Sequence, residues 1–158
     1  MSLRVRSIVP SDFELVSSVM DEWWGGRPVR QLLPRIFFEH FTSTSFVVTE
    51  GAALVAFLVG FRSQSQPSVA YIHFVGVSPS ARGAGTARDL YERFFAKAQQ
   101  IGCSEVQCIT SPVNAGSIEF HRRLGFSILA GNGAQDGVSV TLNHAGPGQH
   151  RVLFRRLI

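Results

Sequence analysis

The chain has 158 residues, a length that suits one domain and allows a continuous core without metals or disulfides. Hydrophobic residues make up 45% of the sequence and charged residues 16%, which excludes a disordered chain. The formal charge of +4 is compatible with a solvated surface and with an anionic partner, so it excludes neither.

The N-terminal part predicts a strand followed by two helices. Residues 3–9 alternate apolar and polar side chains, as a strand does, and Ser11 or Asp12 can cap a helix that runs to about residue 24. The segment 25–28 (Gly-Gly-Arg-Pro) breaks that helix. A second helix is expected at about 29–41, with Pro34 as a kink or restart.

The middle of the chain predicts three strands and the clearest helix. Residues 45–50 and 52–61 flank a Glu-Gly turn and predict a hairpin, and residues 69–77 form an unusually apolar strand that we expect to be central. Residues 84–101 carry a continuous apolar stripe at helical spacing, and Gly102 ends this helix.

The C-terminal part predicts a strand at 105–109, a helix at 114–124 and a strand at 126–130. Residues 131–150 are rich in glycine and polar residues, which indicates a long loop or a loop with irregular strand pieces. A strand at 151–157 closes the chain. The predicted order is therefore β-α-α-β-β-β-α-β-α-β-β.

The two cysteines, Cys103 and Cys108, are too few for a secreted disulfide framework and do not show metal-ligand spacing, so we expect small core residues. The longest apolar run, residues 52–60, is too short to span a bilayer, and the N-terminus lacks the apolar stretch of a signal peptide. We therefore expect a cytoplasmic protein with no metal site and no membrane partner.

The segment Arg82-Gly83-Ala84-Gly85-Thr86-Ala87 joins the apolar strand to the clearest helix. Without a Cβ, its two glycines allow a tight turn and a close ligand approach. The helix start offers free N–H groups and a positive dipole end, and Arg82 adds a positive charge. This loop predicts a phosphate site, although a Gly-x-Gly segment can also be only a turn. It is neither a Walker loop nor a complete dinucleotide fingerprint.

The element order and this loop resemble the Gcn5-related N-acetyltransferase family, whose cofactor loop has the pattern Arg/Gln-x-x-Gly-x-Gly/Ala. Arg82, Gly85 and Ala87 match that pattern in register. A second family signature, an Asn before a helix that ends in Leu-Gly-Phe, is present at 114–126. The resemblance covers nearly the whole chain, most securely residues 69–130.

The resemblance implies a mixed-sheet α/β (α+β) fold of the acyl-CoA N-acyltransferase type, with residues 1–158 as a single domain. It also implies direct transfer of an acetyl group from acetyl-CoA to a primary amine of a small molecule or a peptide, without a covalent enzyme intermediate. Dimers are common in the family, so a homodimer stays an open alternative. A non-catalytic module of the same fold that senses acyl-CoA is the alternative function.

In the family, acetyl-CoA lies in a V between the fourth and fifth strands, which corresponds here to residues 74–77 and 106–110. Backbone groups of the first segment would pair with the pantetheine arm, and the amides of residues 82–87 would take the pyrophosphate. The cofactor-binding residues implied by the resemblance are Phe74, Val75, Val77, Arg82, Gly83, Ala84, Gly85, Thr86, Ala87, Asn114 and Ser117.

Two histidines are the candidates for proton transfer. The family often has a Tyr, the acid for the leaving thiolate, where this chain has His121. His121 is therefore either that acid or a packed histidine. His73 lies in the apolar strand that lines the expected site and is either the base for the amine or a hydrogen-bonded core residue. Strand periodicity predicts that Tyr71, His73 and Val75 share one face.

The acceptor amine is expected between the first two helices and the late loop, by analogy with the family. Trp23 and Trp24 could hold a cationic or aromatic amine, or could pack beneath the second helix, and Arg27 and Tyr71 complete the candidate acceptor residues. Nucleic-acid binding through the arginines of the C-terminal end lacks interleaved exposed aromatic residues, so we expect no nucleic-acid partner.

Overall fold

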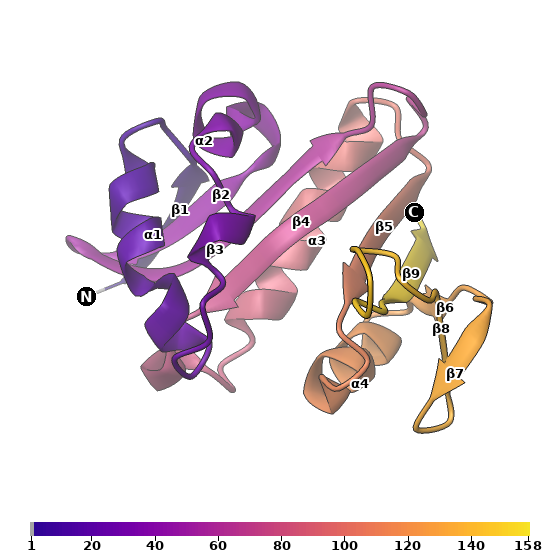
Figure 1. The fold of residues 1–158 in the computed structure, drawn as a ribbon. Helices are drawn as coiled ribbons and strands as arrows, with labels where there is room; N and C mark the ends of the chain where they lie inside the picture. The colour runs from indigo at the N-terminus through magenta and orange to yellow at the C-terminus, as the bar shows by residue number, and fades with distance from the viewer. Residues whose placement is uncertain (1) are drawn as a thin grey trace.

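The computed structural model describes residues 2–158, which form a seven-stranded mixed sheet with helices on both faces (Figure 1). The strands of the large sheet are arranged in the order β1-β2-β3-β4-β5-β9-β6. They are β1 (Leu3–Ser7), β2 (Phe46–Glu50), β3 (Ala53–Arg62), β4 (Val69–Val77), β5 (Glu105–Thr110), β6 (Ser127–Ile128) and β9 (Val152–Leu157). The predicted mixed-sheet α/β architecture is confirmed.

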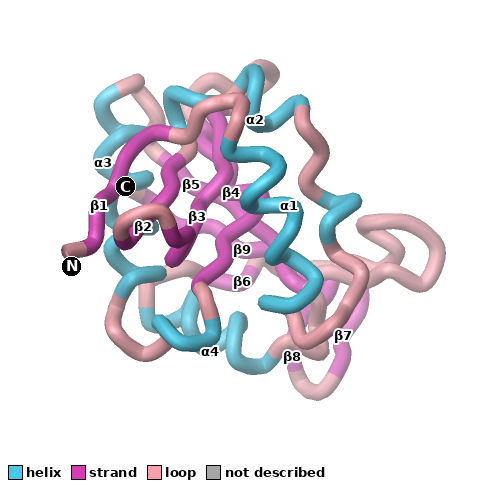
Figure 2. The backbone as a smooth tube through the Cα atoms, turned by 90° about the vertical axis from the view of Figure 1, so that its left-hand side faces the viewer, coloured by secondary structure: helices cyan, strands magenta, loops and turns pink. Residues whose placement is uncertain are grey.

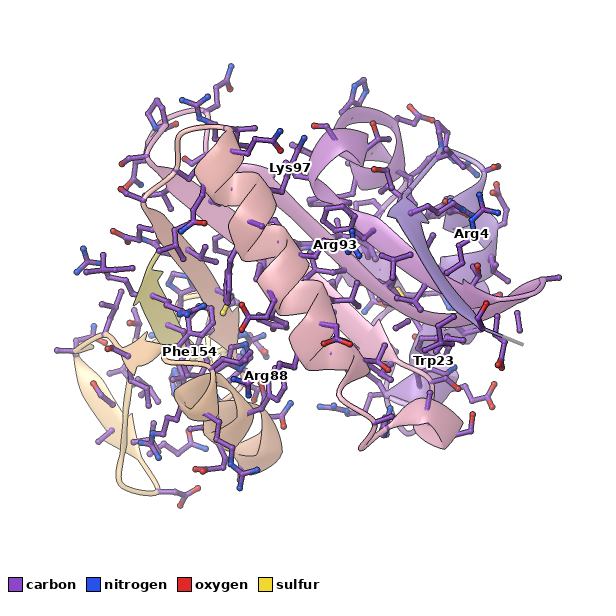
Figure 3. The ribbon with its side chains drawn as sticks, turned by 180° about the vertical axis from the view of Figure 1, so that it is seen from behind. Arg4, Trp23, Arg88, Arg93, Lys97 and Phe154 are labelled. Carbon is purple, nitrogen blue, oxygen red and sulfur yellow. The ribbon has the colours of Figure 1, made fainter. Side chains whose placement is uncertain are left out.

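Four α-helices flank the sheet: α1 (Asp12–Trp23), α2 (Ile36–His40), α3 (Thr86–Gln100) and α4 (Ala115–Arg123). Short 3-10 turns occupy Arg30–Leu32, Thr42–Thr44 and Pro79–Ala81. Figure 2 shows α1 and α2 on one side of the strands, and α3 crosses the opposite face in Figure 3. The sheet is therefore covered from both sides.

Each face of the sheet has its own hydrophobic core. The core on the α3 side contains the predicted stripe of α3, including Leu90, Phe94 and Ala98, together with both cysteines. The core on the α1 side is formed by residues such as Val16, Met20 and Phe57. The amphipathic α3 thus buries one face against the sheet, as the sequence pattern predicts. Its polar side chains Arg88, Arg93 and Lys97 lie along the back of the molecule in Figure 3.

The second predicted helix is much shorter than expected. Pro34 separates the 3-10 turn Arg30–Leu32 from α2, which has only five residues. A proline disfavours helical dihedral angles at the preceding residue, and Leu33 has a φ of −128° and a ψ of 74°. Pro34 therefore acts as a break with a restart, and the backbone between α1 and α2 follows an irregular path.

The glycine-rich segment 131–150 contains a second, two-stranded sheet that the predicted element order lacks. It consists of β7 (Gly133–Gln135) and β8 (Val138–Val140), which pair antiparallel around Asp136 and Gly137. Both turn residues have positive φ angles, 51° and 77°, as a two-residue hairpin turn requires. The Asp-Gly pair was the sequence signal for this hairpin. The strand predicted at 126–130 is shorter than expected and covers only Ser127–Ile128.

Candidate active site

The sheet opens between its two central strands. β4 and β5 run parallel and pair only at Val69–Glu105, Ala70–Val106 and Tyr71–Gln107. Beyond Tyr71 the remaining residues of β4 are paired with β3 alone. One edge of the β4 backbone is thus free to pair with an extended ligand. The opening lies where the resemblance placed the V, at residues 74–77 of β4.

A β-bulge in β4 sits directly at the start of this opening. Val59 of β3 is opposite Phe74, whereas Gly60 is opposite Ile72, so His73 is the extra residue of the bulge. The bulge reverses the alternation of side chains along β4. Val75 consequently packs against the α3-side core, and Phe74 packs against the α1-side core. The prediction that Tyr71, His73 and Val75 share one face is wrong for Val75, because a strand with a bulge does not keep its period of two.

The glycine loop runs from this opening into α3. Gly83 and Gly85 have φ angles of 84° and 85°, in the left-handed region that glycine adopts without strain. A Cβ added at either position would meet no atom within 4 Å, so the space beside the loop is open. Within residues 2–158, no side chain caps the start of α3 at Gly85, and the amides of its first turn point out of the helix end unpaired. The loop therefore fits an anionic group.

The side chain of Arg82 does not point into this anion site. Its Nε donates to the carbonyl oxygen of Val77 at 3.2 Å, and its Nη2 donates to the carbonyl oxygen of Trp23 at 2.5 Å. Trp23 is the last residue of α1, so the guanidinium neutralises carbonyl groups at the negative end of that helix. Arg82 thus joins the glycine loop to α1. Its backbone amide, rather than its charged side chain, is available to a phosphate.

Asn114 and Ser117 form the start of α4. The Oδ1 of Asn114 accepts a hydrogen bond from the amide of Ser117 at 3.1 Å, which makes Asn114 the N-cap of the helix. The cap uses one oxygen of the amide group and leaves the Nδ2 donors for other partners. Asn114 is only partly buried and can contact a ligand in the opening, as the resemblance implies.

His121 is a packed residue and not an exposed one. Its side chain is buried, with 6% of its surface exposed, and its ring stacks on Phe154 at a centroid distance of 4.5 Å. Nδ1 lies 2.7 Å from the carbonyl oxygen of Ser117, and Nε2 lies 2.9 Å from the hydroxyl of Tyr91. Since a carbonyl only accepts, Nδ1 carries the proton and Nε2 accepts from Tyr91. Burial lowers the pKa of His121, and the bond to Ser117 opposes this shift.

His73, in contrast, is half-buried on the α1 side of the opening. Its ring stacks on Phe37 at 4.3 Å, and Nε2 lies 2.6 Å from the carbonyl oxygen of Leu32. By the same argument Nε2 carries the proton, which leaves Nδ1 as the nitrogen that can accept one. Burial lowers the pKa of His73 more than the bond to Leu32 raises it, so the ring is neutral at pH 7.

A sequence profile of the Acetyltransferase (GNAT) family matches residues 11–126, which is more than half of the chain. The chain belongs to this family. The predicted family is therefore confirmed, and acetyl-CoA is the acyl donor that the family uses.

Two named acetyltransferases are similar to part of the chain. A mycothiol acetyltransferase of Pseudarthrobacter chlorophenolicus is 32% identical over 66 residues, which cover 42% of this chain and 20% of the relative. An L-2,4-diaminobutyric acid acetyltransferase of Nocardia farcinica is 28% identical over 78 residues, which cover 49% of this chain and 40% of the relative. The chain thus spans less than half the length of either relative.

Solved structures show that the fold is that of the family. Ard1 from Thermoplasma volcanium has a TM-score of 0.79 at 20% identity, and the match covers 100% of this chain and 99% of that chain. The yncA protein from Salmonella typhimurium, solved with its cofactor acetyl-CoA, has a TM-score of 0.71 at 17% identity, and the match covers 99% of this chain and 94% of that chain. At these identities the likeness extends to the fold alone.

The two tryptophans lie in different surroundings. Trp23 is buried, with 7% of its surface exposed, and stacks on Phe57 in the core. Trp24 is only partly buried and lies 5.0 Å from Phe74, ring to ring, beside the opening. Of the predicted pair, only Trp24 keeps part of its side chain exposed. Arg27 is exposed and its Nε donates to the carbonyl oxygen of Trp24 at 3.2 Å, so it supports the turn after α1.

A chain of partly exposed aromatic rings extends from the opening toward α2, and we call it the aromatic strip. Phe37 contacts Phe41 at 5.2 Å, Phe41 contacts Phe61 at 5.1 Å, and Phe61 contacts Tyr71 at 5.4 Å, all measured between ring centroids. The strip consists of Phe37, Phe41, Phe61, Tyr71 and His73. Sequence reasoning did not include Phe61 among the acceptor residues, although its place on the predicted strand 52–61 was a usable signal.

The arginines at the C-terminal end bind to the protein itself. The Nε of Arg155 lies 3.0 Å from Glu105, and the guanidinium of Arg156 lies 4.2 Å over the ring of Phe95. Arg151 donates to the carbonyl oxygen of His150 at 2.7 Å. These contacts hold the three arginine side chains against the protein.

The described residues contain neither a metal-binding cluster nor a membrane-spanning helix. Across residues 2–158, no three His, Cys, Asp or Glu side chains gather closely enough to hold a metal ion. None of the helices in this part of the chain has the length and apolarity needed to cross a membrane.

Proposed function

We propose that this chain transfers an acetyl group directly from acetyl-CoA to a primary amine of a small molecule or a peptide. The observation that carries the proposal is the opening between β4 and β5, which leads straight into the uncapped start of α3. An unpaired strand edge and a helix N-terminus in series suit a ligand with an extended arm that ends in phosphates. Bound acetyl-CoA supplies the activated acyl group.

The backbone of the chain would hold the donor. The amides of residues 82–87 would bind the pyrophosphate, and the free edge of β4 at Phe74 and Val75 would pair with the pantetheine arm. The carbonyl oxygen of Val77 already accepts from Arg82, so at this residue only the amide is available. A fixed donor next to an acceptor amine gains rate mainly from orientation, which requires no covalent enzyme intermediate.

His73 is the base that this geometry favours. It lies at the bulge where the opening begins, and its neutral ring leaves Nδ1 free to accept a proton from the amine, directly or through water. His121 is not placed for the acid role, because both ring nitrogens have partners inside the core. Instead it fixes the first turn of α4 through Ser117, next to the expected pantetheine site.

The test of the proposal is thiol release from acetyl-CoA with a panel of amines, combined with calorimetric titration of acetyl-CoA. Binding together with amine-dependent thiol release is the expected result. Binding without turnover of any amine would instead favour the alternative, an acyl-CoA sensor of the same fold. Failure to bind acetyl-CoA would refute both functions.

Two variants connect the assay to individual residues. Gly85→Ala forces a φ of 85° on a residue with a Cβ, and strain of about 1 kcal/mol or more should weaken acetyl-CoA binding roughly fivefold or more. Gly116→Ala is the matched control, because its Cβ would lie 4.0 Å from the nearest atom and the helix is retained. His73→Gln should lower kcat and remove the acidic limb of the pH profile, the loss of rate that follows protonation of the base, whereas an unchanged profile would refute its role as a base.

A further inference from the structure

The aromatic strip differs from the rest of the apolar interior in its position. Within residues 2–158, Phe41, Phe61 and Tyr71 belong to neither of the two hydrophobic cores, and each is only partly buried. Rings that merely stabilise a fold are usually buried in its core. These rings instead contact one another in a row on the surface of the sheet.

The strip ends at the place where the acetyl group would be transferred. Tyr71 is the last residue of β4 that pairs with β5, and His73 is the bulge residue at the start of the opening. The ring of Phe37 stacks on His73 at 4.3 Å. A molecule whose amine lies beside His73 would therefore have its remaining atoms next to the rings of the strip.

The charges around the strip argue against an acceptor with several positive charges. Strands β3 and β4 contain no acidic residue at all. Glu39 of α2 is two residues from Phe37 and Phe41, which places it on a different side of the helix. On β5, Glu105 is occupied by Arg155 at 3.0 Å and by Gln107 at 2.5 Å. The strands β3, β4 and β5 therefore offer no free carboxylate to a polyamine or an aminoglycoside.

The one hydroxyl of the strip is neutral as well. Burial raises the pKa of Tyr71 to about 12, so the phenol keeps its proton at neutral pH. Tyr71 can donate or accept a hydrogen bond at the end of the strip but cannot attract a second ammonium group by charge.

We propose that the aromatic strip is the acceptor-binding surface and that the acceptor is a primary amine with an aromatic or bulky apolar group on its carbon chain. This inference rests on the proposed amine acetylation and specifies its substrate class. The apolar group packs on Phe37, Phe41 and Phe61, and the amine reaches His73. Removal of this apolar group from water then raises kcat/KM for such an amine.

The experiment compares 2-phenylethylamine, n-butylamine and spermidine as acceptors at saturating acetyl-CoA. We expect kcat/KM for 2-phenylethylamine to exceed that for n-butylamine roughly tenfold or more, with spermidine no better than n-butylamine. Phe61→Ala should reduce this preference to about threefold or less, mainly through the KM of the aromatic amine, while the KM of acetyl-CoA is unchanged. Phe61→Leu, which keeps most of the volume, guards against a folding defect and should lose less of the preference.

A matched control lies on the same helix as the strip. Ile36 is adjacent to Phe37 in α2 but is 54% exposed, so Ile36→Ala should leave the preference unchanged. Equal kcat/KM values for the two monoamines, or spermidine as the best acceptor, would overturn the inference and leave acetyl transfer intact. If no amine released thiol, the proposed function would fail. Calorimetric titration with 2-phenylethylamine and with n-butylamine would still test the aromatic strip as a binding surface. Equal affinities for the two amines, or no binding of either, would overturn the inference.

Discussion

The hydrogen bond between Tyr91 and His121 allows a sharp test of whether His121 is structural. Both side chains are buried, and the Tyr91 hydroxyl lies 2.9 Å from Nε2. His121→Phe keeps a ring on Phe154 but leaves the hydroxyl without its acceptor, and Tyr91→Phe leaves Nε2 without its donor. Each single substitution should lower the free energy of unfolding by about 1–3 kcal/mol, because a buried polar group loses its partner.

The double variant Tyr91→Phe/His121→Phe should be more stable than the sum of the two losses predicts. It removes both polar groups together, and replacement of both partners by apolar groups of similar shape is nearly neutral. We therefore expect a coupling free energy of about 1–2 kcal/mol from urea unfolding of the four proteins in the cycle. Additive losses would contradict the hydrogen bond as we describe it.

The same four proteins separate a structural role of His121 from a catalytic one. If His121 only packs, the double variant should keep kcat within a fewfold of the parent, measured by thiol release at saturating substrates. If His121 protonated the leaving thiolate, kcat would fall by about a hundredfold or more in both proteins that lack it. That result would refute our assignment of both ring nitrogens to partners in the core.

Two further predictions concern packing and pH. Gly76→Ala should lower the free energy of unfolding in urea by about 1–3 kcal/mol, because the new Cβ would lie 2.7 Å from the Trp24 ring. Gly116→Ala should not lower the free energy of unfolding. Equal effects of the two substitutions would contradict this packing. The pKa values of His73 and His121 are both lowered from an ordinary value of 6.5, so the stability they confer is complete above pH 6.5 and is lost as the pH falls through the folded values. Between pH 7 and pH 5 the melting temperature of the parent should accordingly fall more than that of His121→Phe, and parallel losses would show that His121 does not titrate in this way.

Much of the fold could be predicted because its signals are local. The stripe of α3, its end at Gly102, the cap at Asn114 and the apolar strand β4 all appear where the sequence pattern places them. Helical periodicity, capping and glycine conformation depend on residues within one or two turns of each other. The hairpin at Asp136–Gly137 was equally local, and its turn signal was available in the sequence.

The site depended more strongly on contacts between distant segments. The bulge at His73 follows from the register with β3, and the direction of Arg82 follows from the position of the α1 C-terminus. The aromatic strip combines residues of α2, β3 and β4, so no single stretch of sequence displays it. Side-chain direction at these positions is set by packing partners that periodicity does not encode.

The sequence by itself determined the glycine loop before α3 and the signature of α4, and through them the family and its donor. Such motifs can be recognised in the sequence because anion binding uses backbone amides and a helix cap that lie within a few residues of each other. Only the tertiary structure distinguishes the surroundings of the two histidines. His121 is buried between Tyr91 and Phe154, whereas His73 is half-buried at the bulge where the opening begins. Burial and access are properties of the packed chain, and a residue type at a motif position does not specify them.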